Sequence, residues 1–229
     1  AAKIALEVGG NLQKEYLKRF GLLSKSGVEL IEVGAPLTPE RWREINTMTI
    51  SYGHGIAVSP LQLTSGIGAL VNGGILFDPT LLKLKTVTEL NGDRVITNKT
   101  SKIIRELMRL VVREGTGKKA EVPGYFVGGK TGTADKPGIK RRGYRNQGKI
   151  SSFIAAFPIN KPQYVILALL DEPKGIEATH GYATGGWVAA PVVSTIIKHM
   201  APLVGIGPSN EFAKKMESKS VYLVSHPGR

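Results

Sequence analysis

The segment GYFVGGKTGTAD, residues 124–135, decides the fold, because it fits two motifs that need different structures. Gly124, four further residues and then Gly129-Lys130-Thr131 match G-x-x-x-x-G-K-[ST], the loop that cradles phosphates in nucleotide hydrolases. The same segment contains the triplet Lys130-Thr131-Gly132. On a β-strand, this triplet would suit the binding of an extended peptide. The first motif requires a loop that leads into a helix. The neighbouring residues therefore decide between the two.

The context disfavours the phosphate loop. The residues before Gly124 are polar and end in Pro123, so no buried strand enters the motif. Residues 125–127 are Tyr, Phe and Val, which favour strands. After the motif, Gly132 and Pro137-Gly138 oppose the helix whose N-terminus would face the phosphates. The run VILALLDE, residues 165–172, resembles a magnesium-binding strand, which keeps a nucleotide hydrolase as a remote alternative.

Composition limits the chemistry further. The chain has 229 residues, 41% of them hydrophobic, and a formal net charge of +13, which suits either an anionic partner or simply a soluble basic surface. It contains no cysteine, which excludes disulfides, thiol catalysis and Cys-ligated zinc. His180, His199 and His226 share no ligand spacing with each other or with acidic residues, so no metal is expected. The basic segment 136–149 offers only Tyr144 for stacking on bases, which disfavours nucleic acid as a partner.

Hydrophobic periodicity and turn residues predict an α/β chain of the α+β type. Helices are expected over residues 1–8, 11–20, 38–48, 59–72, 100–114 and 187–200, and a hairpin around Asn91-Gly92. The expected inward faces comprise Leu12, Tyr16, Leu17 and Phe20 in the second helix, and Ile103, Ile104, Leu107, Leu110 and Val111 in the fifth. Strands are expected over residues 125–134, 151–157 and 164–171. Their links hold no crossover helix, which predicts an antiparallel sheet flanked by helices.

A strand through the Lys-Thr-Gly triplet suits recognition of an extended peptide that ends in a carboxylate. The strand edge can pair with the peptide backbone, and Gly132, which has no Cβ, allows a close approach. Lys130 supplies positive potential, and the hydroxyls of Thr131 and Thr133 can bind the carboxylate. A neighbouring backbone N–H can serve an oxyanion hole.

The whole chain, from Ala1 to about Met200, resembles the class B penicillin-binding transpeptidases. The closest likeness is to the septal, division-specific peptidoglycan transpeptidases of Gram-negative bacteria. The matching stretches, in order, are KIALEVGG, YLKRFGL, RWREINTMTISYGHGIAVSPLQL, GALVNGG, GTGKKA, GGKTGTA, SSFIAAFP and GGWVAAPV.

The resemblance implies a serine acyltransferase that cross-links peptidoglycan stem peptides through a Ser acyl-enzyme and is inhibited by β-lactams. Lys130, Thr131, Gly132 and Thr133 would be its catalytic wall, with His54, Gly129 and Ala134 as substrate-binding residues. It implies no cofactor and no nucleic acid, but division proteins as further partners. It also implies a place on the periplasmic side of the inner membrane, with an anchor upstream of this chain.

Two elements of that family are missing. No Ser is followed three positions later by Lys, the S-x-x-K that holds the nucleophile, and none is followed two positions later by Asn, the S-x-N motif. The expectation is therefore that residues 1–206 are the C-terminal part of the transpeptidase domain, that residues 207–229 are a polar tail, and that the chain alone is inactive. A non-catalytic binding module remains the alternative. Asp135 and Ala183-Thr184 also differ from the family pattern, which has a basic residue and aromatic residues there.

Overall fold

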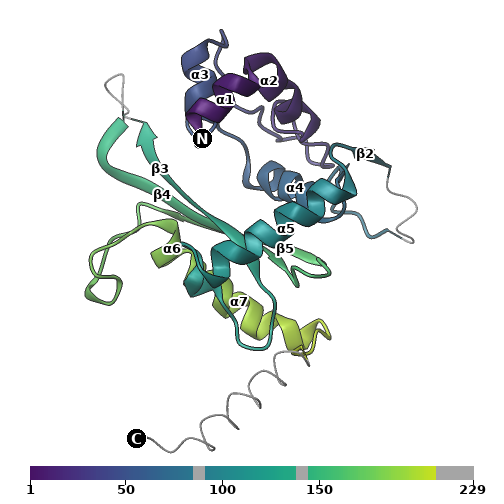
Figure 1. Ribbon diagram of the computed structural model, residues 1–229, viewed down its shortest axis with the longest axis vertical. Helices are drawn as coiled ribbons and strands as arrows, with labels where there is room; N and C mark the ends of the chain where they lie inside the picture. Colours follow the sequence, from purple (N-terminus) through teal and green to yellow (C-terminus); the bar gives the residue numbers. More distant parts are fainter. Residues whose placement is uncertain (85–90, 138–143, 210–229) are drawn as a thin grey trace, which may run out of the picture. The chain divides into compact units, whose positions relative to one another are not determined.

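The computed structural model describes residues 1–84, 91–137 and 144–209 (Figure 1). The chain divides into two compact units. The first comprises Ala1–Glu106 and Ala134–Gly148, and the second comprises Leu107–Thr133 and the chain from Lys149 onward. Helix α5 (Asn98–Arg113) and the strands β3 (Gly128–Pro137) and β4 (Tyr144–Phe157) have residues in both.

A three-stranded sheet in the order β3-β4-β5 carries the second unit, with β5 at Tyr164–Asp171. Strands β4 and β5 are antiparallel, in a register that runs from Phe157 opposite Tyr164 to Ile150 opposite Asp171. Neighbours in the sheet are neighbours in the sequence, which confirms the predicted meander. Strand β3 begins at Gly128 and not at Tyr125, because Tyr125 forms an isolated bridge with Val122 just before it.

The core of this unit lies on one face of the sheet. Phe153, Ala155 and Phe157 alternate along β4 and are fully buried. They share a cluster with Val112 of α5 and with residues of α7 (Ala190–Leu203), including Val193 and Ile197. The predicted closing helix is therefore confirmed, preceded by the short α6 (Gly185–Val188). The described part of the unit also includes the 3-10 turns η2 (Lys118–Ala120) and η3 (Glu177–Thr179).

The described part of the first unit contains four whole helices and the start of α5. The whole helices are α1 (Ala2–Val8), α2 (Gly10–Arg19), α3 (Glu44–Ile50) and α4 (Pro60–Val71). Helix α4 begins where the sequence predicts, since Ser59 Oγ accepts a hydrogen bond from the Gln62 N–H at 3.2 Å and Gln62 Oε1 accepts one from the Ser59 N–H at 3.1 Å. Strand β1 (Ile75–Phe77) pairs antiparallel with β2 (Gly92–Arg94).

Two local predictions are wrong. Helix α3 starts at Glu44 and not near Thr38, because Leu37 pairs with Ala57 through two backbone hydrogen bonds and keeps that segment extended. Gly92 lies within β2 and not in a two-residue turn, while the first half of the predicted hairpin falls partly outside the described residues.

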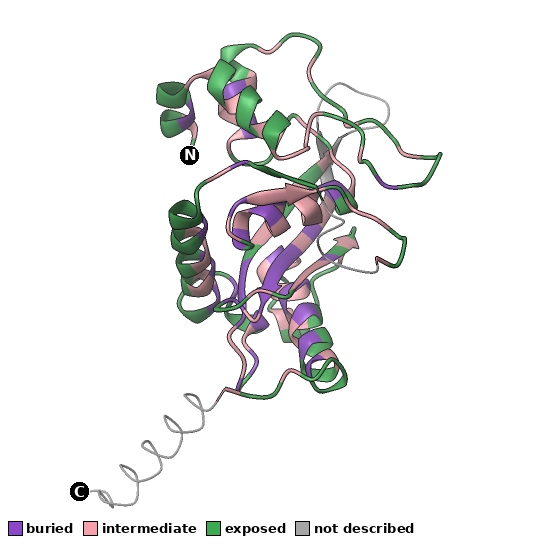
Figure 2. Cartoon of the chain, turned by 90° about the vertical axis from the view of Figure 1, so that its right-hand side faces the viewer, coloured by how far each residue is buried: buried purple, intermediate pink, exposed green. Residues whose placement is uncertain are grey.

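Two of the predicted inward faces also need correction. Leu12 and Tyr16 of α2 are exposed, as are Ile103, Leu107 and Leu110 of α5. The buried residues of α5 are Ser101, Met108 and Val112. Figure 2 shows buried residues concentrated on the sheet, whereas the helices at the N-terminus are largely exposed. Within the described ranges, no helix combines the length and the apolar composition needed to cross a membrane.

Candidate functional site

The four residues predicted to form the catalytic wall, Lys130 to Thr133, lie in the middle of β3. Because the sheet order is β3-β4-β5, this strand is at an edge of the described sheet. The phosphate-loop interpretation is wrong, since Gly129, Lys130 and Thr131 belong to a strand and no helix follows them directly. An edge strand is the setting that the Lys-Thr-Gly interpretation requires, because its backbone groups can pair with an extended peptide.

Lys130 presents its ammonium group at the surface. The side chain is exposed, and Nζ donates a hydrogen bond to the Thr131 carbonyl oxygen at 2.7 Å. A Lys ammonium is a mobile point charge with three donors. The two donors that remain can turn toward an anion near Thr131, which allows Lys130 to attract a carboxylate to this edge.

Both threonine hydroxyls of the wall take part in hydrogen bonds within the second unit. Thr131 Oγ1 lies 3.0 Å from Thr116 Oγ1, and either oxygen can be the donor. Thr133 Oγ1 accepts a hydrogen bond from the Gly185 N–H at 3.1 Å. A hydroxyl has one proton and two acceptor lone pairs, so Thr133 still has its proton to donate. The wall thus offers hydroxyl donors next to a lysine charge, which suits a carboxylate.

The two glycines of the motif have packing reasons to lack a side chain. A Cβ on Gly129 would lie 2.6 Å from the Ile154 carbonyl oxygen and from the Phe153 ring. A Cβ on Gly132 would lie 2.5 Å from Ser152 Oγ. The close approach of neighbouring atoms therefore explains Gly129 without a ligand. The predicted substrate contacts of Gly129 and Gly132 stay predictions.

Gly185 and Gly186 allow the start of α6 to lie directly against the sheet. A Cβ on Gly185 would lie 2.2 Å from the Ser152 carbonyl oxygen and 2.5 Å from that of Gly132. A Cβ on Gly186 would lie 2.3 Å from the Thr116 carbonyl oxygen. Ser151 Oγ also donates a hydrogen bond to the Ala183 carbonyl oxygen. The start of α6 is in this way tied to β3, β4 and the turn after α5.

The other two predicted binding residues are placed differently. Ala134 follows Thr133 on β3 and is half-buried. His54 is in the first unit, in the turn after α3. Its backbone N–H donates to the Thr49 carbonyl oxygen at 3.0 Å, and its ring centroid lies 5.5 Å from that of Tyr52. The contribution of both residues to substrate binding stays a prediction.

Sequence reasoning missed Thr116 and Gly185 as neighbours of the wall. Both occur in stretches that carry the family resemblance, GTGKKA and GGWVAAPV, but spacing along the chain gives no sign of their partners. Thr116 is 15 residues from Thr131, and Gly185 is 52 residues from Thr133.

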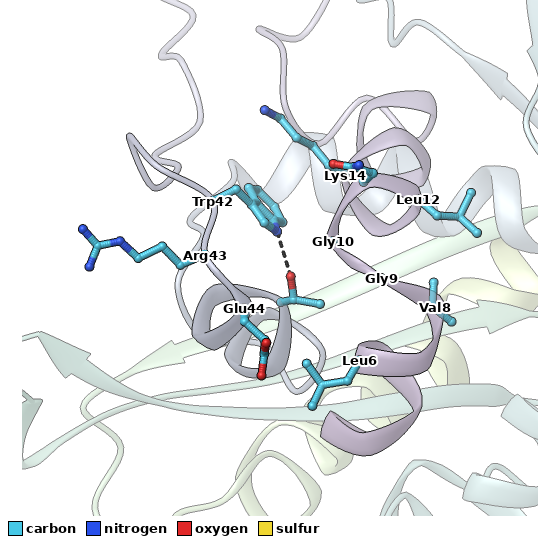
Figure 3. Close-up of a pocket in the computed structure, with 11 residues that line it drawn as sticks. Leu6, Val8, Gly9, Gly10, Leu12, Lys14, Trp42, Arg43 and Glu44 are labelled. Atoms are coloured by element: carbon cyan, nitrogen blue, oxygen red, sulfur yellow. Dashed lines mark hydrogen bonds between the residues drawn. The ribbon is translucent and has the colours of Figure 1, made fainter.

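A second feature is an open pocket of about 710 Å³ in the first unit, between α1, α2 and the start of α3 (Figure 3). Gly9 and Gly10 lie on one side of it and Trp42 on the other, with the indole N–H donating to Thr47 Oγ1 at 3.1 Å. None of the predicted site residues lines it. In the described part of the chain, no group of three His, Asp or Glu side chains is arranged to hold a metal ion.

Comparison with known proteins identifies the family of the chain. Residues 1–198 match the family model of the penicillin binding protein transpeptidase domain. The chain is 42% identical over 219 residues to a probable peptidoglycan D,D-transpeptidase FtsI of Caulobacter vibrioides, and 36% identical over 241 residues to the stage V sporulation protein D of Bacillus subtilis. These alignments cover 92% and 97% of this chain but only 37% and 36% of the relatives, so the chain spans little more than a third of their length.

Solved structures indicate the same family. The apo transpeptidase domain of Burkholderia pseudomallei penicillin-binding protein 3 superposes with a TM-score of 0.80 at 33% identity, over 91% of this chain and 62% of that one. Penicillin-binding protein 3 of Mycobacterium tuberculosis, solved in complex with ampicillin, superposes with a TM-score of 0.79 at 26% identity, over 91% and 49% of the two chains. The chain belongs to the transpeptidase-domain family of the class B penicillin-binding proteins.

Proposed function

We propose that this chain is the C-terminal part of the transpeptidase domain of a peptidoglycan D,D-transpeptidase that acts in cell division. The observation that carries the proposal is the position of Lys130, Thr131, Gly132 and Thr133 on an edge strand, with hydroxyl groups and a lysine charge together. The relatives supply the reaction class, since the Caulobacter relative is named a probable peptidoglycan D,D-transpeptidase.

In the proposed reaction, a Ser hydroxyl attacks the carbonyl of the penultimate D-Ala of a stem peptide. The peptide bond breaks, the terminal D-Ala leaves with a proton, and an ester joins the stem to the enzyme. An amine of a neighbouring stem then attacks this ester and releases the Ser. The wall on β3 binds the terminal carboxylate and orients the peptide for the first step, and a β-lactam places its own carboxylate there.

The serine nucleophile would lie in a part of the same domain upstream of this chain, since no S-x-x-K occurs in residues 1–229. The upstream part would pack against this chain at the pocket of Figure 3 and at the exposed apolar side chains of α1, which are Ile4, Leu6 and Val8. Their exposure fits this role, because adjacent exposed apolar residues mark interaction surfaces. We further propose residues 1–206 as the domain portion and 207–229 as a tail, on the periplasmic side of the inner membrane.

The test is acylation of the full-length protein by a labelled penicillin. Lys130→Ala should lower the second-order acylation rate constant about 10²–10³-fold, the usual cost of removing one preorganised donor, with no change in melting temperature. Lys161→Ala is the matched control, because Lys161 is also an exposed lysine of the second unit but lies outside β3. Equal rates for the two variants would refute the assigned role of Lys130.

A non-catalytic binding module makes the opposite prediction. Such a protein would bind stem peptides reversibly and would form no covalent adduct with penicillin under any condition. The appearance of an adduct on the full-length protein therefore separates the two functions.

A further inference from the structure

Thr116 lies beside the proposed wall and has no role in the function described so far. It occupies the turn Gly115-Thr116-Gly117 after α5, and its Oγ1 is 3.0 Å from Thr131 Oγ1. We propose that Thr116 is a positioning residue, which donates its hydroxyl proton to Thr131 and so leaves the Thr131 proton directed at the bound carboxylate. This inference rests on the proposed function of the wall.

The backbone of Thr116 is held on several sides. The N–H groups of Gly115 and Gly117 both donate to the Val111 carbonyl oxygen at 3.0 Å. A Cβ on Gly117 would lie 3.0 Å from the buried ring of Phe153, and Gly186 packs against the Thr116 carbonyl oxygen. The turn therefore cannot shift without disturbing the core or α6. Its hydroxyl is a fixed partner for Thr131 although the side chain is exposed to solvent.

The single proton of the Thr131 hydroxyl explains why a donor partner such as Thr116 matters. A hydroxyl donates one proton, and a carboxylate can only accept. Thr131 can bind the carboxylate as a donor only if its proton is not used elsewhere, and Thr116 secures this by acting as the donor of their shared bond. Thr133 shows the same arrangement, since it accepts from the Gly185 N–H and keeps its proton. Both hydroxyls of the wall are then oriented as donors toward one anion.

The experiment uses the full-length protein and two labelled probes, a penicillin with its free carboxylate and the methyl ester of the same penicillin. Thr116→Val keeps the shape of the side chain and removes the hydroxyl. It should lower the acylation rate constant about 3–10-fold for the acid, the value of one hydrogen bond, and leave the rate for the ester unchanged. Thr116→Ser, which keeps the hydroxyl, should retain the preference for the acid.

Two further measurements keep the test decisive. The double variant Thr116→Val/Thr131→Val should be no slower than Thr131→Val alone, because the two hydroxyls act as one unit. Thr116→Ala replaces Thr116→Val if the latter has a lower melting temperature than the parent. If the acylation rate constant fell equally for the acid and the ester, Thr116 would only support the fold, and this would overturn the inference.

The remaining outcomes separate this inference from the proposed function. If Thr131→Val slows acylation by the acid while Thr116→Val does not, the inference fails and the wall stands. If neither Thr131→Val nor Lys130→Ala slows it, the proposed wall fails and the inference fails with it.

Discussion

At the scale of single residues, the Thr133 hydroxyl is part of both the fold and the proposed site. It accepts the Gly185 N–H at 3.1 Å, which ties the start of α6 to β3, and it keeps a proton for a ligand. Lys130 differs, because it is exposed and bonds only the adjacent carbonyl group among the hydrogen bonds described. Replacing Thr133 should therefore affect stability and acylation together, whereas replacing Lys130 should affect acylation alone.

Thr133→Val in the full-length protein should slow acylation by a carboxylate-bearing β-lactam about 10–100-fold, since a bond to a charged group contributes about 1.5–3 kcal/mol. The Gly185 N–H would also lose its acceptor, which should cost about 1 kcal/mol and lower the melting temperature by a few degrees. Rate measurements and thermal unfolding check both effects. Thr133→Ser should restore both. Wild-type acylation by the Val variant would contradict the donor role.

At the scale of elements, the three strands and the closing helix could be predicted from the sequence. Their apolar residues recur at strand or helix spacing because they are buried in the core cluster of the second unit. Prediction from the sequence failed where distant contacts decide. Pairing of Leu37 with Ala57 overrides the helix signal at Thr38. Ser101 is buried in α5 because its Oγ donates to the Leu70 carbonyl oxygen at 2.7 Å, so no apolar pattern could reveal that face.

The candidate site could also be predicted only in part from the sequence. Lys130 to Thr133 could be found from the motif, because they are consecutive and only a strand suits their neighbours. Thr116 and Gly185 could not, because the turn after α5 and the start of α6 reach Thr131 and Thr133 only in the folded chain.

The contact of α6 with the sheet gives a prediction about two helical glycines. Gly185→Ala would place a Cβ 2.2 Å from the Ser152 carbonyl oxygen, and the backbone there belongs to β4. We expect a loss of about 1–3 kcal/mol in the free energy of unfolding, as for other overpacked sites. Gly68→Ala in α4 is the control, because nothing lies within 4 Å of its added Cβ, and it should stabilise by about 0.5–1 kcal/mol. Denaturant unfolding of both variants provides the measurement. Similar stabilities would show that α6 is not packed as described.

An ion pair fixes the segment that leads into β3. Arg109 of α5 donates to both carboxylate oxygens of Glu121, at 2.6 and 2.9 Å, and to the Val127 carbonyl oxygen at 2.9 Å. Arg109→Ala should lower the free energy of unfolding by about 1–3 kcal/mol, because a partly buried charge loses its partner.

Arg113→Ala is the matched control for Arg109→Ala, since Arg113 lies on the same helix and pairs with Glu114 at a site where both side chains are more than half exposed, 65% and 58%. Such surface pairs contribute about 0–1 kcal/mol. The midpoint of thermal unfolding distinguishes the two. A smaller effect from Arg109 than from Arg113 would contradict this role for the ion pair.

At the scale of the whole molecule, the chain holds one wall of the proposed site and spans 37% of its Caulobacter relative. A net charge of +13 would favour an anionic partner, which is compatible with substrates that end in a carboxylate. The pocket and the exposed residues of α1 would accommodate the upstream part of the domain. The central claim is that the wall on β3, Lys130 to Thr133, binds the ligand, while a serine elsewhere in the full-length protein reacts with it.

The measurement that tests this claim most directly is the intact mass of the full-length protein after incubation with penicillin, followed by peptide mapping of the adduct. Acylation requires a hydroxyl activated by an adjacent base, which the serines of this chain lack at S-x-x-K spacing. The account predicts a mass increase of one penicillin and an adduct on a serine outside residues 1–229. No adduct, or an adduct on a serine within these residues, would contradict it.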